Sequence, residues 1–150
     1  MFWNETVVEA PKGRGARLRG QPEPAGLQVL LAEDDDADAY LITSVLTRHP
    51  KVGFVMRARD GVEALQMIDN CSIRPHLAII DLHMPRKNGF ALLLELACRE
   101  DFHFPNAVLT SSVASIDEMR SKLRGADYFL TKPESVRDLE TQLSQVIASV

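Results

Sequence analysis

The 150-residue sequence predicts an α/β fold: a doubly wound sheet of five parallel strands with helices on both faces. Two observations and one general rule support this prediction. Short apolar runs alternate five times with segments of helical spacing after residue 26. Helix start and stop signals fall between these runs. Because crossovers between parallel strands are right-handed, five such units form one sheet covered on both sides.

Five short apolar runs have the length of buried parallel strands. Strands that are buried on both faces have continuous apolar runs rather than an alternating pattern. The predicted strands are residues 28–32, 53–58, 77–80, 107–109 and 128–130.

Apolar residues at three- and four-residue spacing predict a helix after each strand. The last helix has the clearest stripe, from Val136 through Leu139, Leu143, Val146 and Ile147 to Val150. The other four are marked by Tyr40, Leu41, Val45 and Leu46; by Val62, Leu65, Met67 and Ile68; by Phe90, Leu93, Leu94 and Ala97; and by Ile116, Met119 and Leu123.

Polar and special residues predict where the helices begin and end. Pro50 follows the first helix, and Gly125 follows the fourth, where a left-handed cap is expected. Start signals are the side chains that can cap the first backbone N–H groups. They are Asp35 or Asp36 for the first helix, Asp60 with Glu63 for the second, and Ser115 with Glu118 for the fourth.

Composition predicts one folded domain preceded by an extension. Hydrophobic residues make up 45% of the chain and charged residues 25%, as in globular proteins. Residues 1–26 contain seven Gly and Pro residues, which predicts a flexible extension, and residues 27–150 form the domain. The extension has four basic and three acidic residues, so the domain keeps thirteen basic and eighteen acidic residues, a net charge of −5.

Charge and hydropathy argue against several classes of protein. The net charge of −4 disfavours non-specific nucleic-acid binding, so we expect no direct DNA binding. No apolar run approaches the ~18 residues of a membrane span, and the first residues lack the pattern of a secretory signal. Cys71 and Cys98 have no CxxC partner and are interpreted as reduced thiols. We therefore expect a cytoplasmic protein without a membrane anchor.

The carboxyl ends of four predicted strands carry polar residues that would meet at one edge of the sheet. Glu33 and Asp34 follow the first strand, Asp81 follows the third, and Thr110 and Lys132 follow the fourth and fifth. Like charges ~4 Å apart repel by about 4 kcal/mol at an effective dielectric constant of 20. A cation relieves this repulsion, and a compact site with only oxygen ligands suits Mg²⁺.

This set of side chains suits phosphoryl transfer. A carboxylate can attack a phosphoryl group and become an aspartyl phosphate. Mg²⁺ and the Lys132 ammonium would neutralise the transferred oxygens, and the Thr110 hydroxyl would donate a hydrogen bond to one of them.

Four segments within residues 27–150 resemble the signature segments of response-regulator receiver domains, the CheY-like family of two-component signalling. They are VLLAEDD, LAIIDLHMPRKNG, AVLTSS and ADYFLTKP, in that order. The resemblance implies a flavodoxin-like (βα)5 fold with strand order 2-1-3-4-5. The Pro-Arg-Lys-Asn-Gly loop is also similar to stand-alone regulators that work with phytochrome-type histidine kinases.

The resemblance also implies a phospho-acceptor and a metal site. Asp81 would accept the phosphoryl group. Mg²⁺ would be bound by Asp34, by Asp81, by the backbone carbonyl of His83 and, through a water molecule, by Glu33.

The same resemblance implies a switch. Thr110 would move toward the phosphoryl group, and the rotamer of Phe129 would be coupled to it. Phe129 is also explained as a core residue. Lys132 would pair with the phosphate or, before phosphorylation, with Asp81, and its peptide bond to Pro133 would be cis.

The hypothesis is a single-domain response regulator. It would take a phosphoryl group from a histidine kinase or a histidine phosphotransfer protein. Phosphorylation would then shift the surface of the fourth helix, fifth strand and fifth helix for partner binding or homodimerisation. Its catalysis would be limited to its own phosphoryl transfer and slow autodephosphorylation, so we do not expect an ordinary enzyme.

Two alternative functions stay open. One is a receiver-like interaction scaffold that works without phosphorylation, and the other is an aspartyl-phosphate hydrolase. A haloacid-dehalogenase-like hydrolase would have a second Asp where His83 stands. A calcium-binding EF-hand is excluded because Ala39 and Val45 replace its Gly and Glu.

Overall fold

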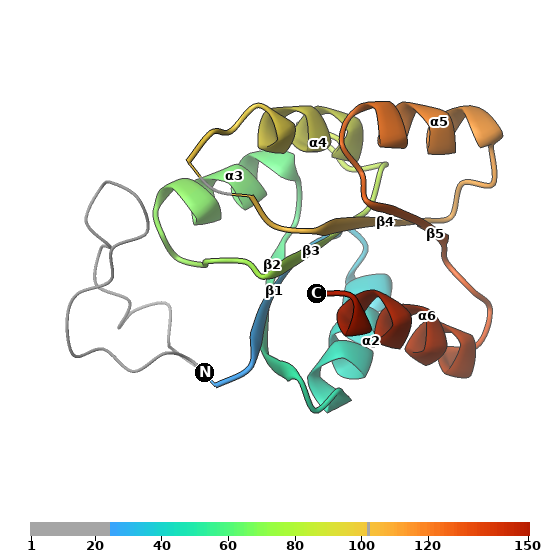
Figure 1. Ribbon diagram of the computed structural model, residues 1–150. Helices are drawn as coiled ribbons and strands as arrows, with labels where there is room; N and C mark the ends of the chain where they lie inside the picture. Colours follow the sequence, from blue (N-terminus) through green and yellow to red (C-terminus); the bar gives the residue numbers. More distant parts are fainter. Residues whose placement is uncertain (1–24, 102) are drawn as a thin grey trace.

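The computed structural model describes residues 25–101 and 103–150 and confirms the doubly wound parallel sheet (Figure 1). The strand order is β2-β1-β3-β4-β5, as predicted. The predicted extension, residues 1–26, lies almost entirely outside the described residues. The strands are β1 (Leu27–Ala32), β2 (Val52–Ala58), β3 (Leu77–Ile80), β4 (Asn106–Thr110) and β5 (Tyr128–Thr131). The helices are α2 (Asp36–Arg48), α3 (Gly61–Asp69), α4 (Gly89–Ala97), α5 (Ser115–Leu123) and α6 (Val136–Ala148).

Helices cover both faces of the sheet, with α2 and α6 on one side and α3, α4 and α5 on the other (Figure 1). Successive residues of the central strands supply the two cores alternately. Leu31 and Ile79 pack toward α2 and α6, whereas Leu30 and Ile80 pack toward α3 and α4. All four are buried, which explains why the central strands have uninterrupted apolar sequences.

Side-chain caps fix the starts of two helices near the carboxyl edge of the sheet. The Asp35 carboxylate accepts from the backbone N–H of Asp38 at 2.8 Å and caps α2, which resolves the choice between Asp35 and Asp36. Asp60 caps α3 by accepting from the N–H of Glu63 at 2.9 Å.

The predicted capping box of Ser115 with Glu118 is wrong. Helix α5 has Ala114 at its N-cap position, without a side-chain cap, so Ser115 is the first helical residue. The Ser112 hydroxyl accepts from the N–H of Ala114 at 3.3 Å and donates to Asp117 at 2.6 Å. This upstream serine organises the first turn, and the helix therefore starts one residue earlier than predicted.

The apolar residues that mark α5 in the sequence are exposed. Ile116 and Met119 are 57% and 58% exposed, and Leu123 is 81% exposed. Val113, just before the helix, is 85% exposed. The helix is confirmed, but these side chains contribute little to the core. Within the described part of the chain, no helix has the length and apolar character needed to cross a membrane.

Replacing Asp60 with Ala is expected to lower the free energy of unfolding by about 1–2 kcal/mol. The buried carboxylate caps α3 and also accepts from Nε of Arg86 at 2.7 Å, so the variant loses both contacts. Urea denaturation measures the change. Asp69→Ala removes an exposed ion pair with Arg99 from the same helix, and we expect it to cost less than about 0.5 kcal/mol. Equal losses in the two variants would contradict the capping role.

Candidate functional site

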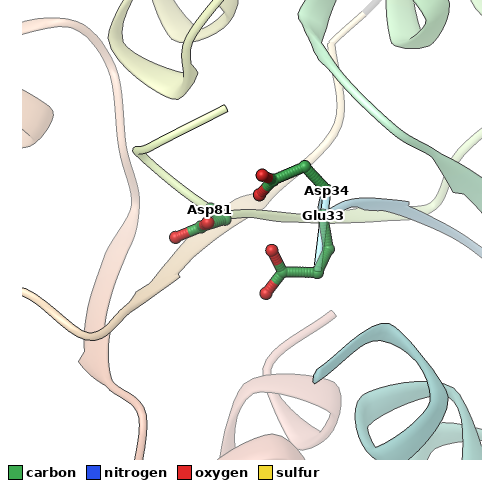
Figure 2. A group of neighbouring side chains, drawn as sticks. All are labelled: Glu33, Asp34 and Asp81. Carbon is green, nitrogen blue, oxygen red and sulfur yellow. The ribbon is translucent and has the colours of Figure 1, made fainter. Parts of the chain in front are cut away.

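Three carboxylates meet at the carboxyl ends of β1 and β3, the neighbouring strands at which the chain order reverses (Figure 2). Glu33 and Asp34 directly follow β1, and Asp81 directly follows β3. One oxygen from each carboxylate lies within 4.8 Å of the others. Glu33 and Asp81 are buried and Asp34 is exposed, so the cluster opens to solvent beside Asp34. The three acidic residues predicted to act together are therefore neighbours.

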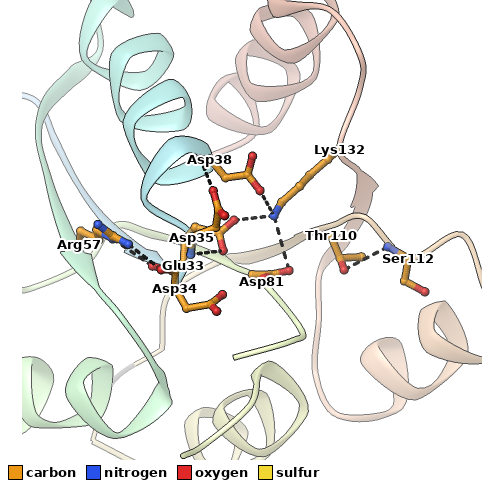
Figure 3. Close-up of polar contacts among 9 residues, drawn as sticks. All are labelled: Glu33, Asp34, Asp35, Asp38, Arg57, Asp81, Thr110, Ser112 and Lys132. Atoms are coloured by element: carbon orange, nitrogen blue, oxygen red, sulfur yellow. Dashed lines mark hydrogen bonds and ion pairs between the residues drawn. The ribbon is translucent and has the colours of Figure 1, made fainter. Parts of the chain in front are cut away.

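The Lys132 ammonium lies among the carboxylates of this edge (Figure 3). Nζ donates to Oε1 of Glu33 at 2.5 Å and to Oδ2 of Asp38 at 2.8 Å. It lies 3.9 Å from Oδ1 of Asp81, which is an ion pair beyond hydrogen-bond length. The lysine thus belongs to the cluster, but its shortest contacts are with Glu33 and Asp38.

The predicted cis bond between Lys132 and Pro133 is wrong, because the described residues contain no cis peptide bond. An X–Pro bond retains a trans preference of about 0.5–1 kcal/mol. Lys132 reaches the site with this trans bond, and its backbone N–H donates to the carbonyl of Thr110 at 2.7 Å.

Thr110 and Phe129 lie on the neighbouring strands β4 and β5. Thr110 is fully buried at the end of β4, and its hydroxyl accepts from the N–H of Ser112 at 3.3 Å. Phe129 is half-buried against the core on the side of α3 and α4. Its packing agrees with a core role, and the coupling of its rotamer to Thr110 stays a prediction.

Burial and neighbouring charge determine the protonation of two site residues. Burial, together with the charge of Asp81, raises the pKa of Glu33 from 4.5 to about 7, and the hydrogen bond from Lys132 only partly opposes this rise. Burial alone would lower the pKa of Lys132, but hydrogen bonds to Asp38 and Glu33 outweigh it and raise that pKa above its ordinary value. The lysine therefore remains charged, while Glu33 gains or loses its proton near neutral pH.

Arg57 supports the loop that carries Glu33 and Asp34, and our sequence reasoning missed it (Figure 3). Its guanidinium donates to the backbone carbonyls of both residues at 3.0 Å. It also contacts the Asp36 carboxylate at 2.7 Å, and Arg59 contacts the same carboxylate at 2.9 Å. The available signal was a basic residue at the penultimate position of an otherwise apolar strand.

An ion pair and a backbone hydrogen bond fix the loop that follows Asp81. Arg86, which has a left-handed φ of 60°, pairs with Asp60 at the start of α3. The N–H of Gly89 donates to the carbonyl of Leu82 at 2.9 Å. His83 has an exposed side chain whose Nε2 lies 3.9 Å from Asp117, so its imidazole points toward α5. The role of the His83 carbonyl as a ligand stays a prediction.

The donors of the cluster fit a small divalent cation. Glu33, Asp34 and Asp81 present only oxygen atoms, and the exposed Asp34 leaves room for water ligands. One ammonium is close to the cluster, so the carboxylates are not fully neutralised by the protein. A divalent cation would relieve the remaining repulsion.

Comparison with known proteins gives a consistent result. Residues 29–144 match the family model of the response regulator receiver domain. The response regulator Rcp1 of Synechocystis sp. is 32% identical over 117 residues, covering 74% of this chain and 80% of Rcp1. The transcriptional regulatory protein CpxR of Klebsiella pneumoniae is 31% identical over 121 residues, covering 80% of this chain. The chain spans about half of that relative, since the match covers 49% of CpxR.

Solved structures give the same picture. The phosphorylated cyanobacterial phytochrome response regulator RcpA has a TM-score of 0.74 and 26% identity, with 81% of this chain and 91% of that chain covered. The Mn²⁺-bound form of Rcp1 has a TM-score of 0.72 and 29% identity, with 80% and 91% covered.

Proposed function

Since this chain belongs to the response regulator receiver domain family, whose function is to accept a phosphoryl group, we propose that Asp81 is its phospho-acceptor. The observation that carries the proposal is the cluster of Glu33, Asp34 and Asp81, whose oxygens lie within 4.8 Å of one another. Lys132 and the buried Thr110 lie at the same edge of the sheet. We propose a histidine kinase or a histidine phosphotransfer protein as the donor.

Mg²⁺ is the proposed cofactor, held by Glu33, Asp34, Asp81 and the backbone carbonyl of His83. The existence of a Mn²⁺-bound form of the relative Rcp1, together with the acidic cluster, supports the binding of a divalent cation. When bound, the cation would offset the carboxylate charges and neutralise negative charge on the phosphoryl oxygens.

Three side chains have different roles in the proposed phosphoryl transfer. An Asp81 oxygen attacks the phosphorus atom, and the bond from phosphorus to the donor imidazole nitrogen breaks, so that its electron pair stays on that nitrogen. The Lys132 ammonium has three N–H groups, two of which bind Glu33 and Asp38, so one remains for a phosphoryl oxygen. The Thr110 hydroxyl would then donate a hydrogen bond to a phosphoryl oxygen and favour the active state.

The proposed output surface comprises α5, β5 and α6. Support comes from the exposed apolar side chains of Val113, Ile116, Met119 and Leu123, which offer contact area to a partner protein or a second copy. The similarity to RcpA, a cyanobacterial phytochrome response regulator, favours a donor kinase of the phytochrome type. Catalysis beyond self-phosphorylation and slow dephosphorylation, and direct DNA binding, are not part of the proposal. A cytoplasmic location stays a prediction.

The first test is incubation with Mg²⁺ and acetyl phosphate, followed by intact-mass measurement. One added phosphoryl group that requires Mg²⁺ is expected. Absence of any adduct, together with no binding of beryllofluoride, would contradict the proposal and favour the phosphorylation-independent scaffold. Multiple turnovers on p-nitrophenyl phosphate would favour the hydrolase instead.

Divalent-cation binding is expected to tighten with rising pH. Below a pKa of about 7, Glu33 is protonated and contributes no negative charge to the site. The affinity for Mg²⁺ should therefore rise by about tenfold between pH 6 and pH 8, following the ionised fraction of Glu33, and level off above. Isothermal titration calorimetry measures this, and Glu33→Gln should flatten the profile. A profile in the variant that is as steep as in the wild type would contradict the assignment.

The raised pKa of Glu33 also predicts how the free energy of unfolding of the cation-free domain depends on pH. Because its pKa is raised in the folded state, Glu33 holds its proton more tightly there than in the unfolded chain. The stabilisation is complete below the ordinary pKa and is lost as pH rises through about 7.

A further inference from the structure

Asp38 lies beside the proposed acceptor site and is not one of the cation ligands proposed above. It belongs to the first turn of α2, where its backbone N–H is capped by Asp35 at 2.8 Å. Figure 3 shows its carboxylate directed toward Lys132, and Oδ2 accepts from Nζ at 2.8 Å. The oxygens that gather within 4.8 Å belong to Glu33, Asp34 and Asp81. The recorded contact of Asp38 with this group of residues is therefore its hydrogen bond to the lysine.

Three carboxylates surround the Lys132 ammonium at unequal distances. Glu33 and Asp38 accept at 2.5 and 2.8 Å, whereas Asp81 lies at 3.9 Å. Charge-assisted N–H···O bonds are normally about 2.7–2.9 Å long, so the ammonium is hydrogen-bonded to Glu33 and Asp38, whereas its 3.9 Å separation from Asp81 is too long for a hydrogen bond. This leaves the carboxylate oxygens of Asp81 without a hydrogen bond from the lysine.

We propose that Asp38 is a positioning residue that holds the Lys132 ammonium away from Asp81, so that the charge of Asp81 stays available to the divalent cation. The inference rests on the proposed function, because it concerns the cation that Glu33, Asp34 and Asp81 would hold. It adds a residue that sets the affinity of that site.

Removing Asp38 changes the set of acceptors around the Lys132 ammonium. Lysine has a flexible four-carbon stem and a compact ammonium group, so it moves readily to another acceptor. Without Asp38, the acceptors near Nζ are Glu33 and Asp81. An ammonium hydrogen-bonded to Asp81 would compete with the cation for the same oxygens and cancel part of their negative charge. Cation binding would weaken.

The test is the Mg²⁺ dissociation constant of the full chain, measured by isothermal titration calorimetry at pH 8. Asp38→Asn should raise it at least about threefold, the scale expected for displacing one unit charge by a few ångströms at a partly exposed site. Asp36→Asn is the matched control. It removes a carboxylate from the same helical turn, but that carboxylate contacts Arg57 and Arg59 rather than Lys132. A smaller change is expected for it. If both variants changed the dissociation constant equally, the loss of any nearby negative charge would explain the effect, and the proposal would be overturned.

A second measurement separates action through Lys132 from direct action on the cation. In a Lys132→Met background, adding Asp38→Asn should leave the dissociation constant within about twofold, because the positioned group is gone. A change as large as in the wild-type background would overturn the proposal. Asp38→Glu keeps a carboxylate within reach of the lysine and should restore most of the affinity, and no restoration would also count against it. Absence of Mg²⁺ binding in the wild-type chain would instead contradict the proposed cation site, a distinguishable failure.

Discussion

An Asp81→Asn variant is expected to gain no phosphoryl group from acetyl phosphate and Mg²⁺ under conditions that modify the wild-type chain. The substitution keeps the size of this buried side chain but replaces the nucleophilic carboxylate with an amide. It also removes one of the three carboxylates that would hold the cation. Intact-mass measurement should therefore show a complete loss of the adduct.

The control for this variant is Asp101→Asn. Asp101 is exposed in the connection between α4 and β4, away from the carboxyl ends of β1 and β3, so this substitution makes the same chemical change without altering the cluster. It should be phosphorylated like the wild-type chain. Phosphorylation of Asp81→Asn to the wild-type level would mean that a different side chain, such as Asp34, is the acceptor.

The sheet could be predicted from the sequence because its signals are local and mutually consistent. The continuous apolar run at residues 77–80 matches β3, which is buried on both faces. Gly125, which follows the C-cap residue Arg124 of α5, has a φ of +99°, as the predicted left-handed cap requires. Apolar spacing also predicted α5 itself. It did not show that Leu123 would be exposed, because a periodic pattern defines a face of a helix without saying what covers it.

The acidic cluster was predictable for a different reason. Parallel strands place their carboxyl ends at one edge, so residues that follow β1 and β3 must be neighbours whatever their separation in sequence. The positions of Glu33, Asp34 and Asp81 follow from this rule together with the family resemblance.

The supporting contacts could not be predicted because they depend on side-chain reach between elements. Arg57 contacts Glu33 and Asp34 only because β2 and β1 are paired in a register that brings its guanidinium beside their carbonyls. Asp38, in the first turn of α2, reaches Lys132 across 94 positions of sequence. Arg57 belongs to no motif, and Asp38 stands only in the Asp34-x-Asp36-x-Asp38 spacing of the excluded EF-hand, which does not indicate a contact with Lys132.

A Gly89→Ala variant is expected to lose both stability and most of its capacity for phosphorylation. Gly89 is buried at the first position of α4 and lies close to the backbone of Asp81 and Leu82. A Cβ atom there would lie 2.3 Å from the backbone carbonyl oxygen of Asp81 and 2.8 Å from Cα of Leu82. Both are backbone atoms, so no side-chain rotation relieves the contact. Overpacking of this kind costs about 1–3 kcal/mol, and small displacements of a reacting group cost about 10²-fold in rate.

Gly125→Ala separates these two effects. Its left-handed φ of +99° makes the variant strained by about 1–2 kcal/mol. The nearest atom to its Cβ is Cβ of Ala97, at 3.2 Å, and the position lies at the amino end of β5, opposite the site. Urea denaturation should therefore show both variants destabilised, whereas the rate of phosphoryl uptake should fall at least tenfold only in Gly89→Ala. If the two rates fell equally, stability rather than the position of the Asp81 backbone would limit the reaction. If Gly89→Ala alone is slow, the close packing of α4 against the end of β3 positions the acceptor.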